Sequence, residues 1–142
     1  MNVTKIPIDQ IQSYLPLPLY TDTVAAGFPS PAEDHIDQDL DLNEYLIPKP
    51  SATYFARANG NSMEGVKIFD GDLLVIDRSQ APEQGRIVIA SVDGQLTCKI
   101  LDINNRCLRG ANPEFDPIPL PDETDLIIEG VVVHAIHHFC WG

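Results

Sequence analysis

Short runs of β-branched and aromatic residues alternate with turn residues from about residue 51 onwards. These runs are SATYFARA (51–58), DLLVID (72–77), GRIVIASV (85–92), QLTCKIL (95–101) and LIIEGVVVHAI (126–136), and Gly, Asp, Asn or Pro separates them. Runs of this length and composition are typical of β-strands. Because there are five or more of them and no long amphipathic helix, the pattern predicts a mainly β fold, a small barrel or sandwich of antiparallel strands.

One pair of strands is predicted most strongly. Asp93 and Gly94 lie between GRIVIASV and QLTCKIL, and Asp-Gly favours a two-residue hairpin because both positions tolerate positive φ. These two runs should therefore pair antiparallel. Strand alternation then puts Cys98 and Lys99 on opposite faces, with Lys99 in the middle of its strand.

The first fifty residues differ from this β-rich part. They hold 7 of the 12 prolines, including those in PLPL and FPSP, and repeated X-Pro steps disfavour helix and suit an extended arm. The stretch from Glu33 to Glu44 has six acidic residues and no Lys or Arg, with leucines at 40 and 42. It is compatible with a short helix or with a solvated turn.

Size, charge and cysteine content narrow the function classes. A chain of 142 residues is the size of one domain with an appended arm. The net charge of -12, with only 9 scattered basic residues, argues against direct nucleic-acid binding and leaves a basic protein partner open. Cys98, Cys107 and Cys140 form no close pair, and no apolar run approaches the ~20 residues that cross a bilayer. We therefore expect a cytoplasmic protein without a membrane segment.

Ser62 and Lys99 each have two interpretations. Within GNSMEG, Ser62 is an ordinary member of a tight turn, or a nucleophile that needs a base within hydrogen-bonding distance. Lys99 either extends to solvent from an open sheet face or is a buried base. Since a lysine with the ordinary pKa of ~10.4 is neutral in only about one molecule in 2,500 at pH 7, a base would need desolvation. A serine-lysine pair would satisfy both requirements.

Other polar groups have simpler interpretations. Asp70 and Asp72 fit an Asp-Gly turn before a strand better than a metal or acid-base pair. The C-terminal cluster of His134, His137, His138 and Cys140 matches no closed zinc site in its spacing. Cys98 should pack as a small apolar residue. We expect neither a metal nor another cofactor.

The segment PSATYFARANGNSMEGVKIFDGDLLVID (50–77), followed by GRIVIASVDGQLTCKIL (85–101), resembles the LexA and UmuD family of self-cleaving serine peptidases. The resemblance includes GNSM before IFDGDLLVID and a lysine 37 residues after the serine, and it extends from residue 24 to about 136. It implies a small LexA/UmuD-type peptidase domain with an extended arm, in which Ser62 is the nucleophile and Lys99 the base. The backbone amides of Ser62 and Met63 are the candidates for oxyanion stabilisation.

The resemblance also implies a cleavage site. The family cuts itself between a small residue and glycine, and Ala26-Gly27 in VAAGFPSP matches this site. The stretch is small-sided, and the prolines that follow discourage helix, as they also would in a plain proline-rich linker. The chain would then consist of an arm that is removed (1–26), an extended linker arm (27–50) and a Ser-Lys peptidase domain (51–142). The sequence departs from the family pattern at Asn61, at Glu64 and at Ala26, where a cysteine can stand. These departures bear on the rate of cleavage.

The family's role implies a homodimer of the SOS response. A RecA filament on single-stranded DNA would prompt removal of the arm, and the shortened form would partner a UmuC-like Y-family polymerase in error-prone translesion synthesis, as in DNA polymerase V. Loss of residues 1–26 leaves a net charge of -11, so DNA contact would fall to the polymerase.

Three alternatives compete with this role. A LexA-like repressor needs a helix-turn-helix domain, which about 25 proline-bearing residues before the cut cannot hold. A signal peptidase with the same catalytic pair would call for a membrane anchor. A catalytically inactive β module that only binds partners stays open, because the presence of Ser62 and Lys99 in a sequence does not prove that they meet.

Overall fold

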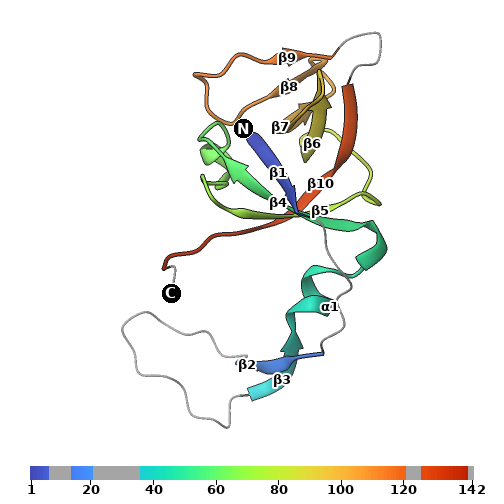
Figure 1. Ribbon diagram of the computed structural model, residues 1–142, viewed down its shortest axis with the longest axis vertical. Helices are drawn as coiled ribbons and strands as arrows, with labels where there is room; N and C mark the ends of the chain where they lie inside the picture. The colour runs from blue at the N-terminus through green and yellow to red at the C-terminus, as the bar shows by residue number, and fades with distance from the viewer. Residues whose placement is uncertain (7–13, 21–35, 121–125, 141–142) are drawn as a thin grey trace. The chain divides into compact units, whose positions relative to one another are not determined.

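The computed structural model describes residues 1–6, 14–20, 36–120 and 126–140 (Figure 1). The chain divides into two compact units. One consists of Met1–Asp9 together with Lys49–Gly142, and the other of Gln10–Pro48. Within the described residues, no helix is long and apolar enough to cross a membrane.

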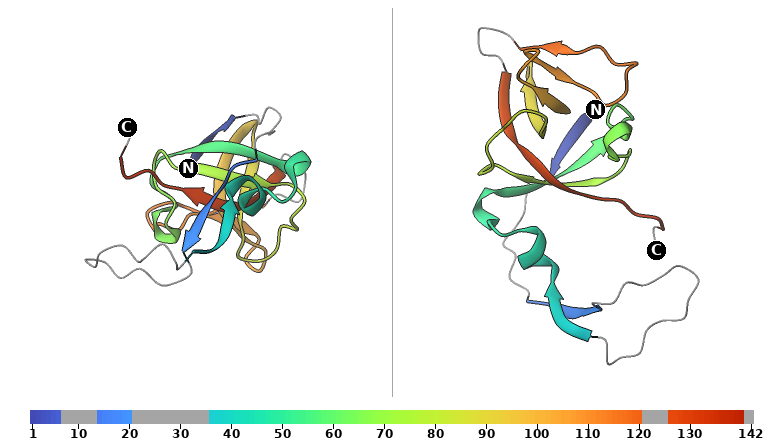
Figure 2. Two further views of the ribbon diagram at one scale, coloured as in Figure 1. Left: turned by 90° about the horizontal axis from the view of Figure 1, so that it is seen from below. Right: turned by 180° about the vertical axis from the view of Figure 1, so that it is seen from behind.

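The larger unit is an antiparallel sheet that closes on itself. Its described strands are, in spatial order, β1 (Asn2–Ile6), β4 (Thr53–Asn59), β5 (Leu73–Asp77), β10 (Leu126–Ile136), β6 (Ile87–Val92), β7 (Gln95–Asp102), β8 (Cys107–Arg109) and β9 (Ile118–Pro119). Strand β1 pairs along its length with β4 and also pairs with β7 at Asn2 and Thr97, so it joins two parts of the sheet (Figures 1 and 2). The mainly β, antiparallel fold is confirmed.

The predicted hairpin is also confirmed. Strands β6 and β7 pair from Ile87 opposite Ile100 to Val92 opposite Gln95. Asp93 and Gly94 both have positive φ, 51° and 81°, as a two-residue turn of this kind requires.

The middle of β7 is covered on both faces. Cys98 and Ile100 belong to one core cluster with residues of β4, β5 and β6, whereas Leu101 packs in a second cluster with Val88 and Leu108. Lys99 lies between these positions and is only 6% exposed. The interpretation in which Lys99 extends to solvent from an open sheet face is therefore wrong.

The smaller unit contains five of the seven prolines of the first fifty residues, together with the acidic stretch. Strand β2 (Pro16–Tyr20) pairs antiparallel with β3 (Ile36–Asp41). A two-stranded sheet tolerates the missing N–H groups of PLPL because both of its strands are edges. The acidic stretch ends in helix α1 (Leu42–Leu46), where the side chain of Asp41 caps the helix by accepting from the Asn43 amide at 3.0 Å. This stretch therefore forms part of a strand and then a short helix.

Two short 3₁₀ helices flank β4, the strand that leads to Ser62. They are η2 (Pro50–Ala52), before the strand, and η3 (Glu64–Val66), after it. The strand begins at Thr53, whose hydroxyl donates to the carbonyl of Lys49 at 2.7 Å. Both ends of β4 are thus defined by local turns, and the second of these turns contains Ser62.

A bulge in β10 at Gly130 gives a test of the fold. Gly130 has a φ of +147°, and a Cβ there would lie 2.5 Å from Cγ2 of Ile76. We expect Gly130→Ala to lower the free energy of unfolding by about 2–4 kcal/mol, through overpacking and backbone strain. Gly85→Ala is the control, because Gly85 has a φ of +82° but no atom within 4 Å of the added Cβ. Its cost should be only the backbone strain, ~1–2 kcal/mol. Equal losses in urea unfolding would contradict this account.

Candidate active site

Ser62 lies in the turn that follows β4, and this turn is held from two sides. The Gly60 amide donates to Oδ1 of Asp70 at 2.8 Å. The carbonyl of Ser62 accepts from the amides of Ala111 at 2.8 Å and Asn112 at 3.1 Å. Ser62 is only 1% exposed, so the serine is fixed and shielded from water.

The same turn packs closely against the loop that follows β8. A Cβ on Gly65 would lie 2.6 Å from the carbonyl oxygen of Ala111. Only glycine allows the two backbones to approach this closely. The close packing supports the orientation of Ser62, because the same loop supplies the two amides that hold its carbonyl.

Lys99 reaches Ser62 from the middle of β7. Its Nζ donates to Oγ of Ser62 at 3.1 Å, across 37 positions of sequence. The Nζ also lies 5.5 Å from the centroid of the Phe115 ring, which covers it from the side of the loop after β8. The structure thus brings together the two side chains that the sequence indicated as nucleophile and base.

A third group, which the sequence did not indicate, completes the cluster. The amino group of Met1 donates to Oγ of Ser62 at 2.9 Å. The Met1 carbonyl accepts from the Cys98 amide and from the Thr97 hydroxyl, each at 3.0 Å. Burial, and then the neighbouring Lys99, lower the pKa of the Met1 amino group to about 5, so it is uncharged at neutral pH. Met1, the residue directly before β1, therefore contacts the Ser62 hydroxyl.

A cavity of about 270 Å³ adjoins this cluster. It is lined by Met1, Asn2, Asn59, Gly60, Asn61, Ser62 and Phe115. The cavity gives room for a further group beside the serine, on the side where the turn after β4 and the Phe115 loop meet.

The other side chains that the sequence indicated have structural contacts. Oδ2 of Asp72 accepts from the Phe69 amide at 2.9 Å, and Oδ1 of Asp72 lies 2.6 Å from Nδ1 of His137. Asp72 thus ties the end of the chain to the start of β5, whereas Asp70 holds the turn at Gly60. Cys98 is fully buried in the core cluster, as expected for a small apolar residue.

The side chain of Met63 is also fully buried, and its carbonyl accepts from the amides of Val66 and Ile68. Ala26 and Gly27, the expected cleavage site, lie outside the described residues.

Comparison with known proteins assigns the chain to a family. A model of the family described as Peptidase S24-like matches residues 18–133. The chain belongs to the Peptidase S24-like family. This match spans both Ser62 and Lys99, and it confirms the resemblance to LexA and UmuD.

Individual relatives of the S24 chain agree with this assignment. This chain is 44% identical over 126 residues to Protein ImpA of Salmonella typhimurium, and the match covers 84% of this chain and 83% of ImpA. It is 47% identical over 121 residues to Protein SamA of Salmonella typhimurium strain LT2, covering 84% of each. It is 36% identical over 121 residues to the LexA repressor of Glaesserella parasuis, covering 83% of this chain but 57% of the repressor.

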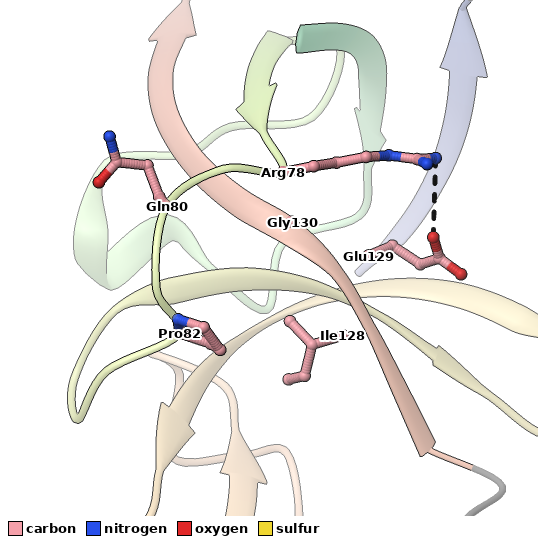
Figure 3. A pocket seen from close by; sticks show the side chains of 6 residues that line it. All are labelled: Arg78, Gln80, Pro82, Ile128, Glu129 and Gly130. Carbon is pink, nitrogen blue, oxygen red and sulfur yellow. Dashed lines mark ion pairs between the residues drawn. The ribbon is translucent and has the colours of Figure 1, made fainter. Parts of the chain in front are cut away.

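A second cavity of the S24 domain lies at the bulge of β10 (Figure 3). It measures about 190 Å³ and is lined by Arg78, Gln80, Pro82, Ile128, Glu129 and Gly130. Arg78 forms an ion pair with Glu129 at 3.7 Å across one side of it. None of these lining residues carries a hydroxyl or thiol nucleophile, so the cluster at Ser62 is the better candidate for a peptidase site.

The reactivity of the three cysteine thiols tests whether solvent reaches the buried part of β7. Burial raises the pKa of the Cys98 thiol to about 12, and Cys107 is also buried, whereas Cys140 is exposed. We expect a disulfide reagent at pH 8 to label one thiol in the folded protein and three in urea. Cys140→Ala should remove the fast reaction. Rapid labelling of Cys98 in the folded protein would instead show that solvent reaches the face of β7 that packs in the first core cluster.

Proposed function

We propose that Ser62 and Lys99 form the catalytic dyad of a serine peptidase that cuts its own chain between Ala26 and Gly27. The observation that carries the proposal is the 3.1 Å contact between Lys99 Nζ and Ser62 Oγ, with both residues buried. A serine hydroxyl is a weak nucleophile until a neighbouring base takes its proton, and the contact distance allows that transfer. Membership of the Peptidase S24-like family supports the same reaction class.

The reaction is acyl transfer to Ser62. Neutral Lys99 accepts the proton of the Ser62 hydroxyl while Oγ attacks the carbonyl carbon of Ala26. The intermediate then collapses, the bond to the Gly27 nitrogen breaks, and Lys99 returns the proton to the leaving amine. Lys99 next takes a proton from a water molecule, whose oxygen attacks the ester carbon. When the ester bond breaks, Lys99 returns this proton to Ser62 Oγ, and the new carboxyl group of Ala26 loses its own proton to solvent.

The surroundings of the dyad favour this chemistry in two ways. Proton transfer from Ser62 requires Lys99 to be uncharged, and its side chain has little access to water, with an aromatic ring on one side. The negative oxygen of the intermediate needs donors, and we assign this role to the backbone amides of Ser62 and Met63. The two bonds to the Ser62 carbonyl support the assignment, because they hold the turn in which both amides lie.

The biological role that we propose is UmuD-like. The chain acts as a homodimer in SOS mutagenesis and is cut in the presence of a RecA filament on single-stranded DNA. The shortened form then partners a UmuC-like Y-family polymerase. Similarity to ImpA, SamA and LexA supports this role. The shortened chain keeps a net charge of -11, which favours a protein partner over direct contact with DNA.

Mass measurement of the purified chain over a range of pH tests the proposal. We expect a product of residues 27–142, whose rate of formation rises with pH because only uncharged Lys99 can act as base. Ser62→Ala and Lys99→Ala should each slow cleavage by about 10³-fold or more. Ser51→Ala and Lys49→Ala, at exposed positions, are the matched controls and should cleave normally. An intact mass at every pH, even with RecA filament added, would refute the peptidase proposal.

A further inference from the structure

Strand β1 pairs with the strand that leads to Ser62, and Met1 contacts the serine itself. Figures 1 and 2 show β1 alongside β4, with its first residue beside the turn after β4. Its register runs from Asn2 opposite Asn59 to Ile6 opposite Phe55. Met1 directly precedes this stretch, and its amino nitrogen contacts Oγ of Ser62.

We propose that β1 occupies the leaving-group side of the peptide-binding cleft, and that it competes there with the segment that follows the scissile bond. This inference rests on the proposed function, because it takes Ser62 as the nucleophile. The ligand of the site is an extended peptide that adds to the edge of β4 in place of β1.

The position of the Met1 nitrogen supports this inference. In acyl transfer, the nitrogen that leaves the scissile bond must lie beside the serine oxygen and within reach of the group that protonates it. The Met1 nitrogen lies 2.9 Å from Ser62 Oγ, and Lys99 Nζ lies 3.1 Å from the same oxygen. Residues 2–6 then extend away from Ser62, as the leaving peptide would.

The hydrogen-bond pattern shows which residues of β1 face β4. The Ala58 amide donates to the Asp72 carbonyl and the Ala58 carbonyl accepts from the Gly71 amide, so both groups face the segment leading into β5. In an antiparallel ladder successive residues alternate in direction. Arg57 and Asn59 therefore face β1, and their partners there are Thr4 and Asn2. It follows that Val3 and Lys5 turn their backbone groups away from β4.

The sequence after the cut fits this pattern. Setting Gly27 at the position of Met1 places Phe28, Pro29, Ser30 and Pro31 at the positions of Asn2, Val3, Thr4 and Lys5. Proline lacks an N–H and is tolerated in a strand only where that group is not needed by the neighbour. Both prolines fall on positions that turn away from β4. A shift by one residue would place both of them on positions that need to donate.

The cavity of about 270 Å³ corresponds to the acyl side of the cleft, the half that β1 does not fill. It adjoins Ser62 and Met1, and in the proposed register it is the free space next to the acyl side of the scissile bond. The small side chain of Ala26 suits such a space. The cleft is thus half-filled by β1 in this structure, and a substrate must displace β1 before its scissile bond can reach Ser62.

A pair of proline variants tests the competition in the full chain. Thr4→Pro removes a donor that faces β4, so β1 should bind less well and self-cleavage should be about fivefold faster or more. Lys5→Pro is the matched control, since the backbone groups of Lys5 turn away from β4. It loses only the contact of Lys5 Nζ with the Tyr54 ring, 4.8 Å from the ring centroid, so its rate should stay within about twofold of the parent. If circular dichroism shows that Thr4→Pro does not fold, Asn2→Pro replaces it. A folded variant that cleaves no faster than the control would overturn the inference.

A binding measurement separates this inference from the proposed function. In chains that also carry Ser62→Ala, we measure binding of a fluorescent peptide, GFPSPAED (residues 27–34). It should bind about fivefold more tightly or better to Thr4→Pro than to Lys5→Pro, and unlabelled MNVTKI (residues 1–6) should displace it. The permuted peptide GPFPSAED, with both prolines on β4-facing positions, should bind more weakly.

The outcomes can be told apart. If binding follows this order but no chain with Ser62 intact ever cleaves, the proposed peptidase activity fails and the competition stands. If the peptide binds equally to both variants or not at all, if MNVTKI does not displace it, or if the permuted peptide binds as well, the inference fails whatever the cleavage rates are.

Discussion

The burial of one lysine beside one serine is the constraint on which the rest of this structure depends. An amine in a protein interior is unfavourable unless it has a partner and close packing. Lys99 meets this requirement because β7 is covered on both faces, with Cys98 in one core cluster and Leu101 in the other. The Ser62 hydroxyl is its hydrogen-bond partner. The long β10, which pairs with both β5 and β6, links the part of the sheet that leads to Ser62 with the part that carries Lys99.

Strand β1 connects the fold with the site. It pairs with β4 and meets β7 at Thr97, so it lies between the strand that leads to Ser62 and the strand that carries Lys99. Met1 also packs in the same core cluster as Met63 and Cys98. A strand in this position stabilises the barrel-like sheet and shields the Ser62–Lys99 contact from water. In the reaction that we propose, both effects would oppose the entry of a substrate, so stability and cleavage would make opposing demands on the edge of β4.

Periodicity predicted the central strands and the β6–β7 hairpin, because five runs rich in β-branched and aromatic residues, with Asp-Gly between two of them, leave few other arrangements. The same reasoning could not predict β1, β8 or β9. Strands β8 and β9 have only three and two residues and pair with β7 and β8, whereas β1 pairs with β4, which is distant in the sequence. This pairing, rather than their own composition, makes them strands. NVTKI has only five residues and precedes a proline-bearing stretch. Its strand structure depends on the free edge of β4, which no local pattern reveals.

The candidate site, like the fold, could be predicted from the sequence only in part. Ser62 and Lys99 were indicated by motif and spacing, but strand alternation alone left Lys99 on a face that could have been open. Only the second core cluster, built around Val88, Leu108 and Val131, shows that this face is covered. The contact of Met1 with Ser62 had no sequence signal, because it joins the backbone amino group of Met1 to the side-chain hydroxyl of Ser62 across 61 positions. A backbone amino group is the same for every residue type, so its half of this contact leaves no motif.

Cleavage after Ala26 would change how strongly β1 is held at the edge of β4. Before the cut, β1 is tethered to β4 through its own chain, and a tethered strand competes at a high effective concentration. After the cut, β1 belongs to a separate peptide, and its retention depends on a short ladder and on concentration in solution. Its departure would leave the edge of β4 unpaired, and a free sheet edge is the part of a β protein that most readily accepts another strand. The reaction that we propose therefore removes the segment that shields its own active site, and it converts a closed sheet edge into an available one.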